Sequence, residues 1–161
     1  MIDRKPDSTL LQNLSGNGFF DGLKPEYLAF LAETAARKQY RSGDALFRQG
    51  EHAGHFYLVL DGMISVEVPA IQGPALQLQK LGSGKILGWS WLIAPYRWDF
   101  QARILSDAEV IEFNGTEVLA KCEADHSFGY DLFKRFTHLM SERLMAARRT
   151  MMDQWNPPGF A

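Results

Sequence analysis

Residues 43–50, GDALFRQG, and residues 56–62, FYLVLDG, decide the fold of this chain of 161 residues. Each stretch is a short apolar run that ends at a glycine. Gly43, Gly50 and Gly62 suit turns that need a positive φ angle or a close approach of two backbones. The two stretches therefore predict strands that are joined by tight turns.

The same pattern extends over residues 37–114, where short apolar runs alternate with residues typical of turns. From Ile64 to Val68 apolar and polar residues alternate, as they do in a strand with one buried face. Several short strands with turns at this spacing favour a β-sandwich or a β-barrel. We expect three side chains of the quoted stretches to fill its interior: Phe47, Tyr57 and Val59.

Helical patterns flank this β region on both sides. Residues 8–14 predict a short helix capped by Asp7 or Ser8, and Pro25 suits the first turn of a second helix. Beyond residue 115 the sequence predicts a short helix over 117–124 and a long helix over 127–155.

The long helix carries an apolar stripe with steps of three and four residues, close to the spacing of a coiled-coil seam. This stripe packs either on the barrel or on a second copy of the chain. Because a helix of this length projects far beyond a small barrel, the sequence predicts a homodimer through the C-terminal helix. The stripe consists of Phe133, Phe136, Met140, Leu144, Ala147 and Met151.

The two opening stretches resemble the signature of cyclic-nucleotide-binding domains, which occur in catabolite activator proteins, kinase regulatory subunits and ion channels. Residues 81–84, LGSG, are similar to a turn of that family, and Gly88 lies where its phosphate-binding cassette begins. The resemblance covers about residues 18–150. It implies a mainly β protein with flanking helices, a double-stranded β-helix of the jelly-roll type with eight strands. The positions that carry it are Gly43, Asp44, Phe47, Gly50, Tyr57, Val59 and Gly62.

With this resemblance the chain divides into four parts. They are an N-terminal helical segment over 1–36, a β-roll over 37–114 with its ligand cassette at 82–100, C-terminal helices over 115–155, and a tail over 156–161.

The cassette departs from the family at both side chains that would hold a cyclic nucleotide. The resemblance implies a glutamate after the glycine, which binds the ribose hydroxyl, and a later arginine, which binds the phosphate together with the N-terminus of a short helix. Here Trp89 stands at the glutamate position and Trp98 at the arginine position. Asp99 stands where a small hydroxyl residue often assists, and a carboxylate there would repel an anion.

Two nearby residues keep an anion site open. Arg97 is one position early, so that a bulge could turn it inward; otherwise it is a surface arginine or an ion-pair partner of Asp99. Ser90 could donate to an anion or cap a short helix over 90–94. The candidate ligand-binding residues are Gly88, Trp89, Ser90, Trp91, Arg97, Trp98 and Asp99.

Three interpretations of the cassette tryptophans follow. The indoles of Trp89, Trp91 and Trp98 could fill an unused pocket, which would make the protein a ligand-free interaction domain. They could instead line a pocket remodelled for a flatter, more apolar ligand, or belong to a divergent binder of cAMP or cGMP. Our leading hypothesis is a regulatory or sensor module that acts through an unknown protein partner. The sequence does not identify its cofactor, which could be a cyclic nucleotide or another small ligand.

Other functions find little support in the sequence. A net charge of −2 provides no basic face for nucleic acid. The few residues after Trp155 cannot form a helix-turn-helix, so we expect no sequence-specific DNA binding. No apolar run suits a signal peptide or a membrane span, which predicts a cytoplasmic protein. We find no catalytic motif and predict no enzyme, a structural role for Cys122, and no metal site from the pair His52 and His55.

Overall fold

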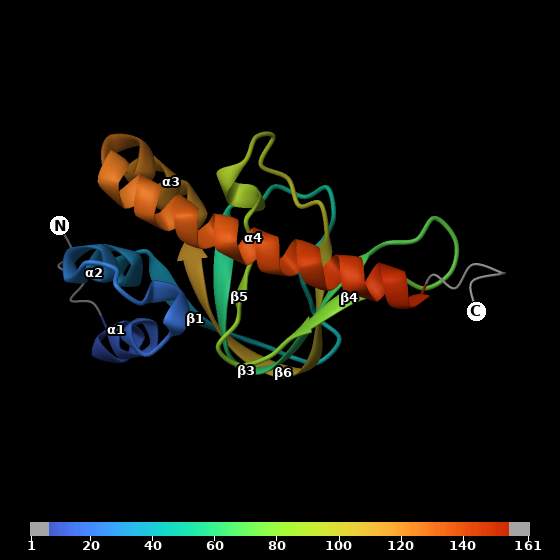
Figure 1. The fold of residues 1–161 in the computed structure, drawn as a ribbon. Coiled ribbons are helices and arrows are strands. Elements are labelled where there is room, and N and C mark those ends of the chain that lie inside the picture. The colour runs from blue at the N-terminus through green and yellow to red at the C-terminus, as the bar shows by residue number, and fades with distance from the viewer. Residues whose placement is uncertain (1–6, 155–161) are drawn as a thin grey trace.

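A roll of antiparallel strands forms the centre of the molecule, with helices from both ends of the chain packed beside it (Figure 1). The computed structural model describes residues 7–154. The elements in chain order are α1 (Ser8–Ser15), η1 (Gly18–Phe20), α2 (Pro25–Glu33), β1 (Ala35–Tyr40), β2 (Ala45–Phe47), β3 (His55–Val68), β4 (Leu76–Leu81), β5 (Ile86–Leu87), η2 (Ser90–Leu92), β6 (Gln101–Asn114), α3 (Gly115–Ala124) and α4 (His126–Gln154).

The helices begin where their capping residues predict. Asp7 caps α1 by accepting a hydrogen bond from the Thr9 amide at 3.0 Å, and Pro25 opens α2. The first strand begins at Ala35, two residues before the predicted start of the β-roll. Trp155 and the tail over 156–161 lie outside the described residues.

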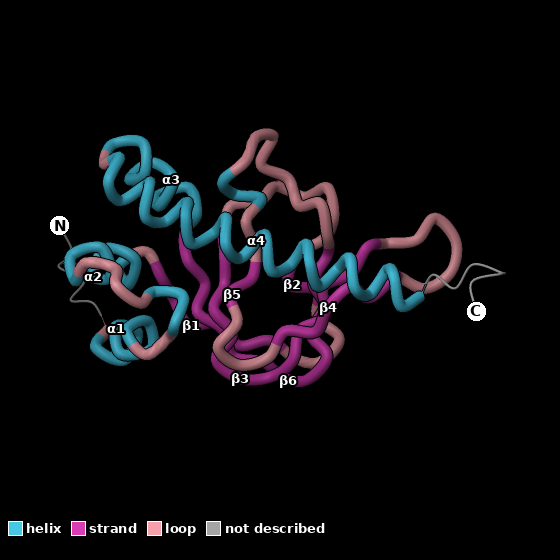
Figure 2. The backbone as a smooth tube through the Cα atoms, viewed as in Figure 1, coloured by secondary structure: helices cyan, strands magenta, loops and turns pink. Residues whose placement is uncertain are grey.

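Six strands form one sheet within residues 7–154, in the order β1-β6-β3-β4, with β2 paired to β6 and β5 paired to β3. Figure 2 shows how this sheet rolls up. The expected count of eight was too high, because β3 and β6 are each 14 residues long and bend instead of breaking. Their ladder shifts register around Gly62. There a Cβ atom would lie 2.5 Å from the Asp107 carbonyl oxygen, so only glycine lets the strands approach.

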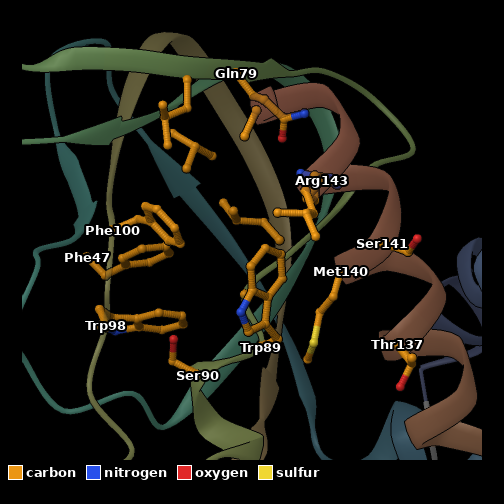
Figure 3. Close-up of a pocket in the computed structure, with 16 residues that line it drawn as sticks. Phe47, Gln79, Trp89, Ser90, Trp98, Phe100, Thr137, Met140, Ser141 and Arg143 are labelled. Atoms are coloured by element: carbon orange, nitrogen blue, oxygen red, sulfur yellow. The ribbon is translucent and has the colours of Figure 1, made fainter. Parts of the chain in front are cut away.

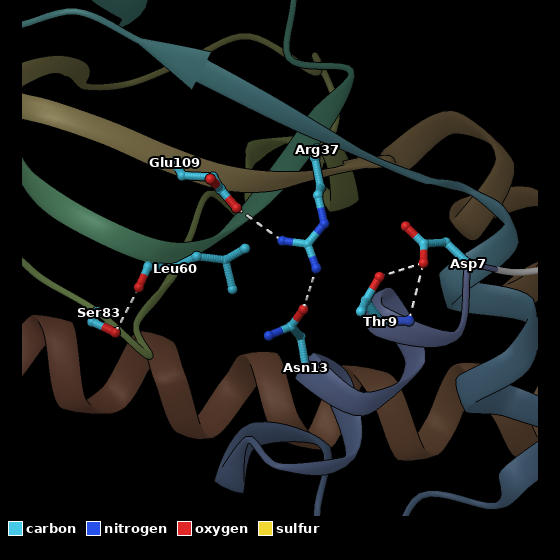
Figure 4. Close-up of polar contacts among 7 residues, drawn as sticks. All are labelled: Asp7, Thr9, Asn13, Arg37, Leu60, Ser83 and Glu109. Carbon is cyan, nitrogen blue, oxygen red and sulfur yellow. Dashed lines mark hydrogen bonds and ion pairs between the residues drawn. The ribbon is translucent and has the colours of Figure 1, made fainter.

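Arg37 ties the N-terminal helices to the roll. Its guanidinium forms an ion pair with Glu109 of β6 at 2.8 Å and donates a second hydrogen bond to the Asn13 side chain of α1 at 2.6 Å (Figure 4). Strand β1 and helix α1 are thereby held in a fixed relation.

Two apolar clusters divide the core. The one inside the roll contains Phe47, Tyr57 and Val59, which confirms the prediction that these side chains fill it. The other lies where the helices meet the roll, and α4 contributes Phe136 to it. The helical cluster consists mainly of Leu14, Phe20, Leu31, Phe56, Trp91, Ile111, Phe113, Val118, Phe128, Leu132 and Phe136.

The apolar stripe of α4 is therefore split rather than continuous. Phe136 is fully buried, whereas the exposed fractions of Phe133, Leu144 and Met151 are 41%, 69% and 62%. The first half of α4 packs into the helical core, and the second half extends across the roll (Figure 1). None of the helices in the described part of the chain is long and apolar enough to cross a membrane.

Candidate functional site

A cavity of about 510 Å³ lies between the β-roll and α4 (Figure 3). Its volume falls within the range of about 300 to 1,000 Å³ that small-molecule sites occupy. The roll, the cassette and the helix each contribute one wall. The lining residues are Phe47, Val66, Leu78, Gln79, Leu87, Gly88, Trp89, Ser90, Trp98, Phe100, Thr137, Met140, Ser141, Arg143, Leu144 and Ala147.

The indole of Trp98 forms the aromatic floor of this cavity. It is 5% exposed and stacks on Phe47, with ring centroids 3.7 Å apart and planes at 11°. A Cβ atom on Gly88 would lie 2.9 Å from the Trp98 ring, so the glycine makes room for the indole. Trp98 therefore presents a flat apolar surface to the cavity.

Trp89 supplies a second aromatic surface. It is partly buried, and its ring lies edge to face with Phe100 at 6.4 Å and 76°. In Figure 3 Trp89 stands between the aromatic floor and α4, with Phe47, Phe100 and Trp98 on its other side. A flat ligand would meet ring faces and edges here.

Trp91 belongs to the helical core and not to the cavity. Its indole stacks on Phe56 at 4.8 Å, lies edge to face with Phe136 at 5.3 Å, and donates a hydrogen bond from Nε1 to the Gly88 carbonyl at 3.1 Å. Trp91, in the middle of η2, thus fixes the cassette on the fold, while Trp89 and Ser90 line the cavity.

The polar candidate residues of the cassette also differ in whether they line the cavity. Ser90 is buried and lines the cavity, and no side-chain cap precedes η2, which ends at Leu92 instead of residue 94. Arg97 is exposed and donates to the Gly50 carbonyl at 2.9 Å. Asp99 is exposed too, and neither Arg97 nor Asp99 is among the lining residues. Of the seven candidates, the structure brings together Gly88, Trp89, Ser90 and Trp98 at the cavity.

Helix α4 supplies residues that sequence reasoning did not assign to the site. Met140, Leu144 and Ala147 were assigned to the apolar stripe, and all three line the cavity. Arg143 lies beside them on α4 and lines the cavity too. A cation placed three residues after Met140 and four before Ala147 is on the same helix face, which is the signal that could have found it.

Arg143 is the one charged side chain among the lining residues. Its Nη2 donates to the Ile86 carbonyl of β5 at 2.7 Å. Burial lowers the pKa of Arg143 to about 10, against a smaller opposing effect of Glu142. The guanidinium stays protonated at neutral pH, and the ion pairs among residues 7–154 include none for it.

Three side chains along α4 fasten it over the cavity. Arg135 donates to the Phe19 carbonyl at 2.6 Å, Arg143 to Ile86, and Thr150 to the Leu78 carbonyl at 3.4 Å. Because these acceptors belong to η1, β5 and β4, the helix is held along most of its length. No group of His, Cys, Asp and Glu in the described part of the chain is suited to a metal ion.

Comparison with known proteins identifies the family. The model of the cyclic nucleotide-binding domain matches residues 37–125, more than half of the chain. The chain therefore belongs to the cyclic nucleotide-binding domain family, which confirms the resemblance. No curated protein gives a significant match.

Solved structures share the fold. A putative cyclic nucleotide-binding protein from Geobacter metallireducens superposes with a TM-score of 0.75 at 24% identity, over 83% of this chain and 96% of that one. The catabolite activator protein of Thermus thermophilus gives 0.66 at 23% identity, over 83% of this chain and 61% of that one. A regulatory subunit of a cAMP-independent protein kinase A from Trypanosoma brucei gives 0.70 at 17% identity, over 92% and 49%.

Proposed function

We propose that this protein is a non-catalytic sensor module that binds a flat, largely apolar ligand between the β-roll and α4. The observation that carries the proposal is the stack of Trp98 on Phe47, with ring centroids 3.7 Å apart. This stack replaces a cation by aromatic surface where the family resemblance expects the cyclic phosphate. Aromatic walls favour ligands that bury area and stack.

The remaining lining residues argue against the usual pose of a cyclic nucleotide. No Asp or Glu is among them, so the ribose hydroxyls would lack the carboxylate that the resemblance implies. Trp89 occupies that position and also takes up volume. One related structure is described as the regulatory subunit of a cAMP-independent kinase, which supports the view that this fold also operates without cAMP.

Helix α4 is the element through which a ligand would act. It forms one wall of the cavity, and it also presents exposed apolar side chains such as Phe133 and Met151. A ligand that binds one position of α4 more tightly than another shifts the population of the two positions. A partner that contacts the exposed part of α4 would detect this shift, and we propose a second copy of the chain as one such partner.

Calorimetric titration with cAMP and cGMP tests the ligand proposal. We expect no binding at micromolar concentration, and micromolar binding of either nucleotide overturns the remodelled pocket. Tryptophan fluorescence during a metabolite screen provides the complementary measurement, because Trp89 and Trp98 line the cavity. A flat response across the screen supports the alternative of a ligand-free interaction domain.

Light scattering tests the homodimer. We expect a dimer for the wild-type chain and a monomer for the variant Phe133→Glu/Met151→Glu, whose substituted side chains are exposed in the single chain. A monomeric wild-type protein overturns the dimer and leaves the ligand proposal intact.

A further inference from the structure

Arg143 is the one charged residue in the lining of a cavity whose other lining residues are uncharged and mostly apolar. We propose that the ligand is an aromatic carboxylate, whose ring lies on the indoles of the cassette and whose carboxylate binds Arg143. This inference rests on the proposed function. It adds the charge of the ligand and names the residue that binds the charged group.

The positions of the groups define the ligand. In Figure 3 Arg143 lies on α4, on the side of the cavity away from Phe47 and Trp98, with Trp89 between them. A ligand that reaches both sides must be apolar and flat at the roll and polar at the helix. Ser90, Thr137 and Ser141 add hydroxyl groups to the lining, but Arg143 is the only side chain there with a full charge.

The charge balance of the cavity calls for an anion. Arg143 is partly buried, and its neighbouring acceptor is the neutral Ile86 carbonyl at 2.7 Å. Glu142, the adjacent carboxylate, lies 3.3 Å from Nε2 of His138 instead. A cation that is partly buried and has no carboxylate within ion-pair distance loses some of its hydration without compensation, and a bound anion offsets that cost.

A carboxylate suits this cation better than a phosphate ester does. The planar guanidinium matches the two oxygens of a carboxylate in a bidentate pair. A phosphate monoester such as phenyl phosphate carries close to two negative charges at neutral pH, more than a single arginine can balance, and the aromatic walls offer it no further cation. Because Arg143 belongs to α4, the same bond would join the ligand to the helix that we propose as the output element.

Calorimetry on the full chain tests the inference with matched pairs of probes. Benzoate, naphthoate and indoleacetate are each titrated against the corresponding carboxamide, which keeps the shape and removes the charge. We expect at least one carboxylate to bind roughly tenfold more tightly than its amide, since a hydrogen bond to a charged group contributes about 1.5 to 3 kcal/mol. Phenyl phosphate serves as the phosphate probe, and we expect it to bind more weakly than the best carboxylate.

Three variants assign this preference to a residue. Arg143→Met should abolish the preference for the carboxylate over the amide, and Arg143→Lys should retain part of it. Arg148→Met is the matched control, because Arg148 is exposed on the same helix and does not line the cavity. Thermal unfolding of each variant establishes that it is folded, and amide binding by Arg143→Met establishes that its cavity is intact.

The outcomes separate the two proposals. Equal binding of carboxylates and amides, or a preference that survives in Arg143→Met, overturns the role of Arg143 and leaves the apolar pocket standing. Tighter binding of phenyl phosphate overturns the carboxylate assignment. If none of the probes binds, the ligand pocket itself is overturned, and this inference with it.

Discussion

The indole of Trp98 lies flat on the ring of Phe47, with centroids 3.7 Å apart and planes at 11°. Both side chains are buried inside the roll. Phe47 ends strand β2, and Trp98 lies in the loop before β6. This pair stabilises the fold and also shapes the surface that a ligand would touch.

A double-mutant cycle measures the strength of the pair. We expect Trp98→Leu and Phe47→Leu each to lower the free energy of unfolding by about 2 to 4 kcal/mol, because each leaves a cavity in the core. The double variant should lose less than the sum, by about 0.5 to 1.5 kcal/mol, the usual coupling of an aromatic pair. Urea unfolding of the four proteins provides the measurement, and strictly additive losses contradict the coupling.

Gly88 and Gly43 form a matched pair for the next prediction. Both have positive φ angles, of 100° and 92°, so alanine at either position strains the backbone by about 1 to 2 kcal/mol. Only at Gly88 would the added Cβ atom also meet Trp98, at 2.9 Å, whereas nothing lies within 4 Å at Gly43. We expect Gly88→Ala to be the more destabilising variant, by about 1 to 3 kcal/mol in urea unfolding.

The same pair of glycine variants in a Trp98→Leu protein tests whether the indole causes the difference. In a Trp98→Leu protein the extra cost of Gly88→Ala should shrink, because the indole that the methyl group would meet is gone. An unchanged difference between the two glycine variants means that the indole is not responsible.

How far the sequence predicts the structure depends on the kind of signal. Glycines mark turns, and the spacing of apolar residues such as Phe47 marks strands and helices, so the β-roll and the flanking helices could be predicted. The number of strands could not, because the bend of β3 at Gly62 leaves the strand continuous. Local pattern alone does not tell a bend from a break.

The site shows the same limit. Trp89, Trp91 and Trp98 are the same residue type within ten positions, and the sequence does not tell them apart. In the structure Trp91 packs in the helical core, whereas the other two line the cavity. Arg143 reaches the cavity only because α4 crosses the roll, which is a tertiary arrangement that no short stretch of sequence encodes. The sequence therefore pointed to Trp89 and Trp98 on one wall of the cavity, but not to the α4 residues of the wall opposite to them.

Cys122 provides a prediction about local opening. It lies on α3 and is 6% exposed, and a Cβ atom on Gly129 of α4 would be 2.8 Å from its carbonyl oxygen. Burial, with a smaller contribution from Glu123, raises the pKa of the Cys122 thiol to about 11. The reactive thiolate is therefore scarce at neutral pH.

Alkylation of Cys122 by iodoacetamide, followed by mass spectrometry, checks this prediction. We expect the native protein to react at least about a hundredfold more slowly than the unfolded chain at the same pH. Gly129→Ala should accelerate the reaction, because the added methyl group separates α3 from α4. Native and unfolded rates within tenfold of each other would show that the interface between these helices opens readily.

Glu67 connects the wall of the cavity to acid stability. Its carboxylate is 2% exposed on β3, next to Val66 of the cavity wall, and accepts hydrogen bonds from Gln101 at 2.9 Å and from Arg103 at 2.8 and 3.1 Å. Burial raises the pKa of Glu67, but the hydrogen bonds from Gln101 and Arg103 outweigh it and hold the pKa below its ordinary value. The ionised carboxylate therefore stabilises the folded state.

The sign of the pH dependence follows from this lowered pKa. The stabilisation is fully present above the pKa of the unfolded chain, about 4.3, and is lost as the pH falls through the lower pKa of the folded state. We expect Glu67→Gln to reduce the free energy of unfolding by about 1 to 3 kcal/mol at neutral pH, and by less at an acid pH below the lowered pKa of the folded state, where the wild-type carboxylate is protonated too. The control Glu109→Gln removes a half-exposed pair with Arg37 and should cost about 1 kcal/mol or less. Urea unfolding at both pH values decides the matter, since a Glu67→Gln deficit that does not change with pH assigns the loss to packing and not to the charge.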